Sequence, residues 1–191
     1  MSAKRIDGRA AGFMRFLERY RHDKGALANL RGALSDTRRH RAWPLLGGFK
    51  EDEAIGNPTY EIVAALWAHA KDESDEKVGN LGATLRVLGG KYDVKSGKFE
   101  HDSFQGRFKR LLSCDKEDVT THVAPVVRAA VAKGVGVDFP RLLSDLLWWG
   151  EKVKVEWAKA FWEVQEEDGG LSSNFIDKED SEPVGTVEVA P

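Results

Sequence analysis

The stretch FQGRFKRLLSCDK, residues 104–116, predicts a short amphipathic helix followed by the start of another helix. Its apolar residues recur at helical spacing and form one face, made of Phe104, Phe108, Leu111 and Leu112. Arg107 and Arg110 lie on a neighbouring face, and no acidic residue stands three or four positions from either arginine. Surface helices usually carry acids at such positions, because these pairs stabilise a helix whereas like charges repel. The stretch therefore predicts a helical fold and two arginines that face something other than a carboxylate.

Helical periodicity dominates the rest of the chain, and strand-like alternation is nearly absent. We expect an all-α protein of about eight helices, arranged as two packed helical-bundle subdomains. Residues 1–90 are predicted to form a basic N-terminal subdomain, residues 91–101 a linker, and residues 102–165 a C-terminal helical bundle. Residues 166–191 are acidic and rich in Gly, Ser and Pro, so we expect a disordered acidic tail.

Capping residues and glycines predict several helix boundaries. Asn57, which a proline follows, is typical of a helix start, and Asp138 is a second capping residue. Gly134 predicts the end of the helix before it, and Pro125 predicts that this helix is kinked or shortened. A Ser-Gly pair within residues 91–101 is compatible with a short hairpin.

The net charge of −2 conceals a strong asymmetry along the chain. Residues 1–50 carry 12 Lys and Arg against 4 Asp and Glu, whereas residues 151–191 carry 4 against 11. A nearly neutral net charge that combines a basic N-terminal segment with an acidic C-terminal segment indicates a charged partner.

The expected compartment follows from cysteine usage and hydropathy. The single cysteine, Cys114, excludes an internal disulfide and fits a reducing compartment. No apolar run approaches the roughly 18 residues of a membrane span. The first residues also lack the long apolar segment of a secretory signal. We expect a soluble cytoplasmic protein with no membrane partner.

No pattern typical of catalysis or of a bound cofactor is present. The sequence lacks a phosphate-binding loop and the GxSxG, HExxH and paired CxxC motifs. The five histidines are not at metal-ligand spacing, so surface or capping roles are favoured. Packing explains Cys114 better than reactivity does, and core packing is favoured for Trp67, Trp149 and Trp157, which lie on apolar stripes. Trp148 could be partly exposed, but core packing is favoured for it as well, while Trp43 and Trp162 are assigned to neither role. We predict no catalytic residue, no metal, no cofactor and no enzymatic activity.

The basic residues are the most informative group. An ordinary solvated surface fits Arg15, Arg19 and Lys159, because acids stand near them in the sequence. The less compensated residues are Lys24, Arg31, Arg38, Arg39, Arg107 and Arg110. Clustered, unpaired cations bind phosphate backbones, and the planar guanidinium suits phosphate oxygens. These residues are therefore candidate nucleic-acid contacts.

Spacing adds two expectations about these cations. Lys24, Arg31 and Arg38 are seven residues apart, so they would lie near one line if their helix continues that far. Aromatic residues do not alternate with the cations on the same face, which favours contact with the backbone over reading of bases.

Four segments, taken in order, resemble the small subunit of the type I-E CRISPR Cascade complex, the CasB family. They are ANLRGAL around Arg31, RFKRLLSCDK, VDFPRLLSDLLWWG and VKVEWAKAFW, and the resemblance is strongest over residues 104–162. It implies an all-helical, non-catalytic subunit, present as a pair within a curved ribonucleoprotein. Such a subunit would contact the other Cascade subunits and the crRNA-containing complex, and would help to hold the target DNA strands of an R-loop.

Basic residues carry this role in the family. Carried over by position, they are Arg31, Arg107, Lys116, Lys152 and Lys154, while Arg110 and Arg128 lie in matching segments. The family often has a second basic residue where this chain has Gly32. R-loop formation is close to energetic balance, so a few contacts to the backbone suffice to shift it.

Two other functions compete with this interpretation. A helical adaptor could use the same basic faces to dock on acidic protein surfaces, without contacting nucleic acid directly. A small hydrolase would need a metal cluster or an activated nucleophile, and the sequence provides no sign of either.

Overall fold

The computed structural model describes residues 7–70, 79–90, 92–93, 96, 98–100 and 102–162. The first half contains α1 (Gly8–Glu18), α2 (Lys24–Arg31), α3 (Trp43–Leu46) and α4 (Pro58–His69), with the 3-10 turns η1 (Gly32–Leu34) and η2 (Arg39–Arg41). The second half contains α5 (Leu81–Gly89), β1 (Tyr92–Asp93), β2 (Lys98–Phe99), α6 (Asp102–Ser113), α7 (Val119–Ala132), α8 (Phe139–Leu147) and α9 (Glu151–Trp162). The predicted all-α fold is confirmed, with one short hairpin added. The predicted tail, residues 166–191, lies outside the described residues.

Several helix boundaries follow from their local chemistry. The Asn57 side chain accepts a hydrogen bond from the amide of Thr59 at 3.1 Å, which satisfies an amide at the start of α4. Asp138 caps α8 in the same way. Gly134 follows α7 with a φ of 72°, a conformation that side chains disfavour. α7 runs through Pro125 without ending, so the helix is not shortened there.

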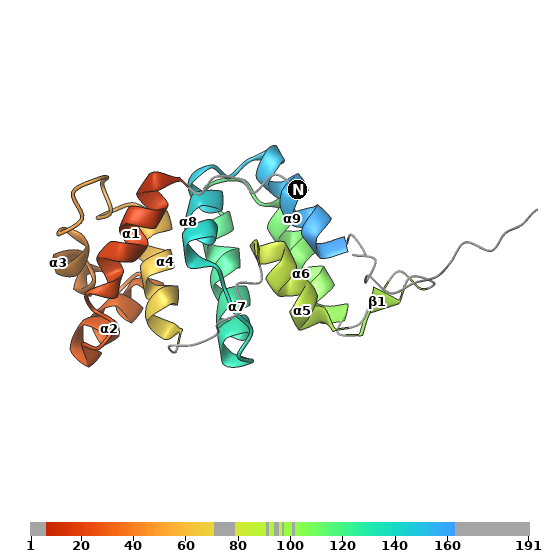
Figure 1. The fold of residues 1–191 in the computed structure, drawn as a ribbon, viewed down its shortest axis with the longest axis horizontal. Helices are drawn as coiled ribbons and strands as arrows, with labels where there is room; N and C mark the ends of the chain where they lie inside the picture. Colours follow the sequence, from red (N-terminus) through yellow and green to blue (C-terminus); the bar gives the residue numbers. More distant parts are fainter. Residues whose placement is uncertain are drawn as a thin grey trace, which may run out of the picture.

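The helices form three groups along the long axis of the molecule (Figure 1). α1 to α4 lie at one end, α7 and α8 in the middle, and α5, α6 and α9 at the other end. α4 packs against α2 and also against α7 and α8, whereas α5 packs against α9 and α6. One hydrophobic core connects the groups, with fully buried side chains such as Phe13, Leu66 and Phe161. Among the described residues, no helix has the length and hydropathy needed to cross a membrane.

α5 comes before the predicted linker in sequence but packs against helices that follow it. A Cβ atom on Gly82 would lie 2.8 Å from the carbonyl carbon of Trp157, so only glycine permits this approach of α5 to α9. The Asn80 side chain, which caps α5, also donates to the carbonyl of Glu156 at 3.1 Å. In residues 91–101, β1 and β2 pair in an antiparallel hairpin. The division of the chain into subdomains at this segment stays a prediction.

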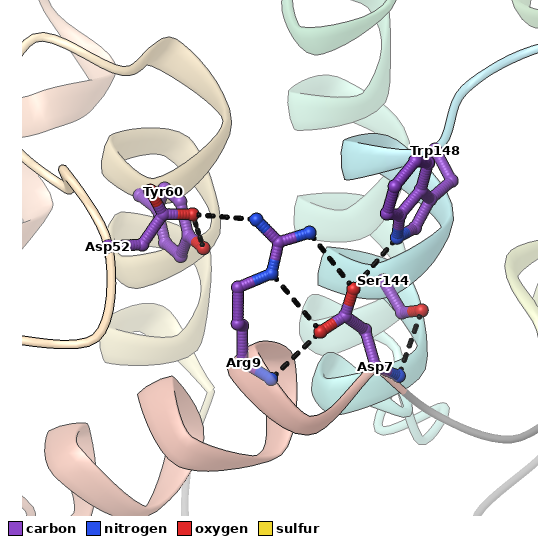
Figure 2. A network of polar contacts seen from close by, with 6 residues as sticks. All are labelled: Asp7, Arg9, Asp52, Tyr60, Ser144 and Trp148. Carbon is purple, nitrogen blue, oxygen red and sulfur yellow. Dashed lines mark hydrogen bonds and ion pairs between the residues drawn. The ribbon is translucent and has the colours of Figure 1, made fainter.

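Asp7 fixes the start of α1 to the end of α8 (Figure 2). Its carboxylate accepts from the backbone amide of Arg9 at 2.8 Å and from Nε1 of Trp148 at 2.8 Å. Its own amide donates to Oγ of Ser144 at 3.3 Å. The hydrogen bonds from Arg9 and then from Trp148 lower the pKa of Asp7 to about 2. The charged carboxylate therefore stabilises the contact between α1 and α8.

Arg9 extends the same network to α4 (Figure 2). Its Nη2 pairs with Asp7 and its Nη1 with Asp52, both at 3.2 Å. Asp52 also accepts from the hydroxyl of Tyr60 at 2.8 Å, and this bond is the main cause of its lowered pKa. Burial, followed by the bond to Asp52, raises the pKa of Tyr60. Two carboxylates and one guanidinium thus connect α1, α4 and the segment between α3 and α4.

The tryptophans and the cysteine mostly follow the sequence-based expectations. Trp67, Trp149 and Trp157 are buried, as predicted. Trp148 is 61% exposed, so the expectation that it packs in the core is wrong. Its hydrogen bond to Asp7 holds the indole at the surface. Cys114 is buried, and this burial is the main cause of its raised pKa, which agrees with a packing role.

Candidate nucleic-acid interface

Arg31, the last residue of α2, is held in place by the end of α4. Its side chain is exposed, and Nε donates to the carbonyl of Ala68 at 2.8 Å. The last carbonyls of a helix carry partial negative charge, so a guanidinium is favourable there. Among the described residues, no carboxylate pairs with this side chain, so its outer N–H groups are available for a phosphate.

Arg128 of α7 faces the same helix end. His69, the last residue of α4, lines a groove of about 710 Å³ together with Arg128. Burial lowers the pKa of His69, and the positive charges of Arg31 and Arg128 lower it further. Two arginines that are far apart in sequence therefore lie close to one imidazole.

The end of α7 also lies against α6. Nζ of Lys133, at the C-cap of α7, is 5.1 Å from the ring centre of Phe104. Cζ of Arg107 is 5.4 Å from the centre of the same ring. The buried aromatic ring thus holds two cations on the outside of α6 and α7.

The C-terminal part of α7 lies between these two sites. Figure 1 shows α7 between α4 and the pair formed by α5 and α6. We use the name basic row for Arg31, Arg128, Lys133 and Arg107, which come from α2, α7 and α6. Among the described residues, none of the four has a carboxylate partner at salt-bridge distance. A run of such cations is the feature that phosphate backbones require.

A second group of cations surrounds the turn between α6 and α7. Lys154 lies over the ring of Trp149, at 5.6 Å from its centre, and Trp149 donates to the carbonyl of Cys114 at 3.1 Å. Arg110 is exposed on α6, and both its charge and that of Lys154 act on Cys114. Two acids at the same turn, Asp115 and Asp118, act on the same thiol. Lys116, next to Asp115, and Lys152, two residues before Lys154, are also exposed. Because the turn carries acids as well as cations, this group is mixed in charge.

The cations before α3 are arranged differently from the expectation. α2 ends at Arg31 and η1 follows, so Lys24, Arg31 and Arg38 do not share one helical line. The chain folds back instead, and a Cβ atom on Gly32 would lie 3.0 Å from the carbonyl of Arg38. This close approach favours glycine at position 32. Lys24 and Arg38 are exposed.

Arg39 has an acidic partner, contrary to the expectation. Its Nη2 lies 2.9 Å from Oε2 of Glu61, whose side chain is 3% exposed. Glu61 also accepts from Nε1 of Trp43 and from the amide of Gly56, both at 2.8 Å. Burial of this carboxylate requires a cation, so Arg39 stabilises the fold. Arg39 is therefore a weaker candidate for a phosphate contact than a cation without such a partner.

The family model described as CRISPR-associated protein Cse2 matches residues 26–162. The chain belongs to the CRISPR-associated Cse2 family. This membership confirms the resemblance to CasB, a name that two similar solved structures also carry. Among the described residues of this Cse2-family chain, no three His, Cys, Asp or Glu side chains could hold a metal ion together.

Solved structures agree with the family. CasB from Thermus thermophilus is 26% identical, with a TM-score of 0.59, and the match covers 81% of this chain and 98% of that one. CasB from M. ruber is 28% identical, with a TM-score of 0.63, and covers 83% and 94%. A chain of a CRISPR RNA-guided surveillance complex is 22% identical, with a TM-score of 0.62, which shows the fold alone. No curated protein matches the sequence.

Sequence reasoning missed two members of the interface, Lys133 and His69. Nothing local in the sequence indicates that Lys133 reaches Phe104, which belongs to another helix. His69 gives no signal in the sequence, since its two arginine neighbours come from other helices. Only tertiary packing brings these groups together.

Proposed function

We propose that the chain is a non-catalytic, nucleic-acid-binding subunit of a type I-E CRISPR surveillance complex. In this role it stabilises crRNA-guided binding of target DNA through basic surface residues. The observation that carries the proposal is the basic row, four exposed cations from three helices without carboxylate partners among the described residues. Membership in the Cse2 family supports the setting. A similar fold within a CRISPR RNA-guided surveillance complex supports it as well.

The proposal includes partners and a division of roles among the cations. The partners are the target DNA strands, the crRNA-containing complex, its other subunits and a second copy of this chain, all in the cytoplasm. The basic row makes the main contacts to phosphate. Lys116, Lys152, Lys154 and Arg110 form a secondary set, and Lys24 and Arg38 are exposed cations outside both groups. Since the contacts are to phosphate, we expect affinity without sequence preference and with strong salt dependence.

Direct binding of the full chain to labelled single- and double-stranded oligonucleotides tests the proposal. We expect binding at low salt that weakens steeply at moderate salt. The complex should also be co-purified from cells with its RNA and partner subunits. A chain that joins the complex normally but loses no target DNA when Arg31 and Arg107 are changed to Glu would indicate a protein adaptor instead.

A further inference from the structure

The groove at the end of α4 combines an apolar wall with a positively charged end. Pro125, Ala129 and Val131 of α7 supply the apolar part, and His69 and Arg128 the polar part. The groove has a volume of about 710 Å³, much larger than one phosphate group requires. An extended strand could therefore pass along it with one phosphate at the charged end.

Arg31 lies near this end of α4, where its charge acts on His69. Its Nε donates to the carbonyl of Ala68, the residue before His69, and its two Nη groups have no hydrogen-bond partner among the described residues. Arg128 lines the groove from α7, on another helix. A phosphodiester oxygen between two guanidinium groups accepts charge-assisted hydrogen bonds from both.

The charges that face His69 come from two helices. α4 packs against α2, η1, α7 and α8. Arg31 of α2 and Arg128 of α7 act on the imidazole, and η1 contains no titratable side chain. In α8, Arg141 and Asp145 pair with each other at 3.1 Å. Among the described residues, His69 thus has positive neighbours and no acidic neighbour that acts on it.

We propose that this groove binds one phosphodiester group between Arg31 and Arg128, and that His69 takes up a proton when the phosphate enters. This inference rests on the proposed function and identifies a specific phosphate contact within it. In the free protein, two guanidinium charges oppose protonation of the imidazole. The phosphate neutralises part of that charge and offers an oxygen to the new N–H donor, so protonation and binding favour each other.

The sign of the pH dependence follows from this coupling. The pKa of His69 is lowered in the free protein and is higher in the complex. Affinity therefore rises as the pH falls from the pKa of the complex towards that of the free protein. Uptake of one proton limits the change to about tenfold in affinity per pH unit.

Binding of a labelled oligothymidylate to the full chain at about pH 8 and about pH 5.5 tests the coupling. The variant His69→Gln removes the titrating group, and His40→Gln, an exposed histidine in η2, is the matched control. We expect the unmodified chain and His40→Gln to bind several-fold more tightly at the lower pH. His69→Gln should lose most of this gain, so that its affinity changes much less between the two pH values. Equal pH dependence in all three proteins would overturn the inference and leave the proposed function intact.

NMR titration of the His69 imidazole separates the two proposals. The probes are the oligothymidylate and dimethyl phosphate, a phosphodiester analogue that stays singly charged at these pH values. A rise in the pKa of His69 with either probe supports the site, and Arg128→Gln should diminish the rise. If dimethyl phosphate raises the pKa but the oligothymidylate does not bind, the phosphate site stands and the proposed function fails. An imidazole whose titration neither probe moves overturns the inference.

Discussion

Asp7→Asn removes one negative charge from the network that connects α1 to α8 while keeping a side-chain oxygen as acceptor. The Asp7 carboxylate is 16% exposed and receives hydrogen bonds from Arg9 and Trp148. These bonds lower its pKa from 3.8 to about 2. The folded protein therefore prefers the charged form, and the asparagine stands in for the protonated form at every pH.

The magnitude follows from the pKa difference. A shift from 3.8 to about 2 corresponds to at most about 2.4 kcal/mol of stability, at about 1.36 kcal/mol per unit. The Arg9 partner is 41% exposed and is screened by salt, so we expect about 1–2 kcal/mol. Because the folded-state pKa is depressed, this contribution is fully present above the unfolded value of 3.8 and is lost as the pH falls towards about 2.

Urea unfolding of both proteins at neutral pH and at several acidic pH values measures the effect. We expect Asp7→Asn to lower the free energy of unfolding by about 1–2 kcal/mol at neutral pH. The difference should shrink as the pH falls below the unfolded pKa of 3.8 and vanish only below the folded pKa of about 2. Trp148→Phe, which removes one donor to the same carboxylate, should show a smaller loss with the same pH dependence. Equal stability of Asp7→Asn and the unmodified chain at neutral pH would refute the reasoning.

Three further substitutions test the packing of the second half of the chain by urea unfolding. Gly82→Ala should destabilise the fold by about 1–3 kcal/mol or more, because the new Cβ overlaps the backbone of Trp157. Gly106→Ala, the matched control within α6, has open space around it and should stabilise by about 0.5–1 kcal/mol. Trp157→Phe should cost at least about 1–3 kcal/mol, because Asp145, 1% exposed, loses a donor at 2.7 Å. A neutral Gly82→Ala or Trp157→Phe would contradict the described packing.

Local sequence chemistry was sufficient for the helices and for several of their ends. Asn57, Asp138 and Gly134 act at the predicted boundaries because capping depends on residues close in sequence. Arg107, in the stretch of residues 104–116, is exposed, as its spacing indicated. Its guanidinium lies over the ring of Phe104 in the same helix. These features can be predicted because each depends only on residues that are close in sequence.

Features that depend on tertiary packing could not be predicted in the same way. Arg39 stands in a dense basic segment, yet its partner Glu61 comes from another helix. Trp148 lies in an apolar stretch, yet a hydrogen bond to Asp7, 141 residues earlier in the sequence, holds it at the surface. The neighbours of His69 likewise come from α2 and α7. In each case the contact joins residues whose separation in sequence gives no local signal.

The salt dependence of nucleic-acid binding by the double variant Arg31→Gln, Arg107→Gln tests the central claim most directly. Fluorescence anisotropy of a labelled oligonucleotide, measured over a range of salt concentrations, gives the slope of log affinity against log salt. The matched control is Arg15→Gln, Lys159→Gln, which removes two exposed cations outside the basic row. Loss of two phosphate contacts should reduce the slope by about 1.4 for single strands and about 1.8 for duplex, while the control keeps the original slope. An unchanged affinity and slope in the Arg31, Arg107 variant would contradict the claim that the basic row binds phosphate.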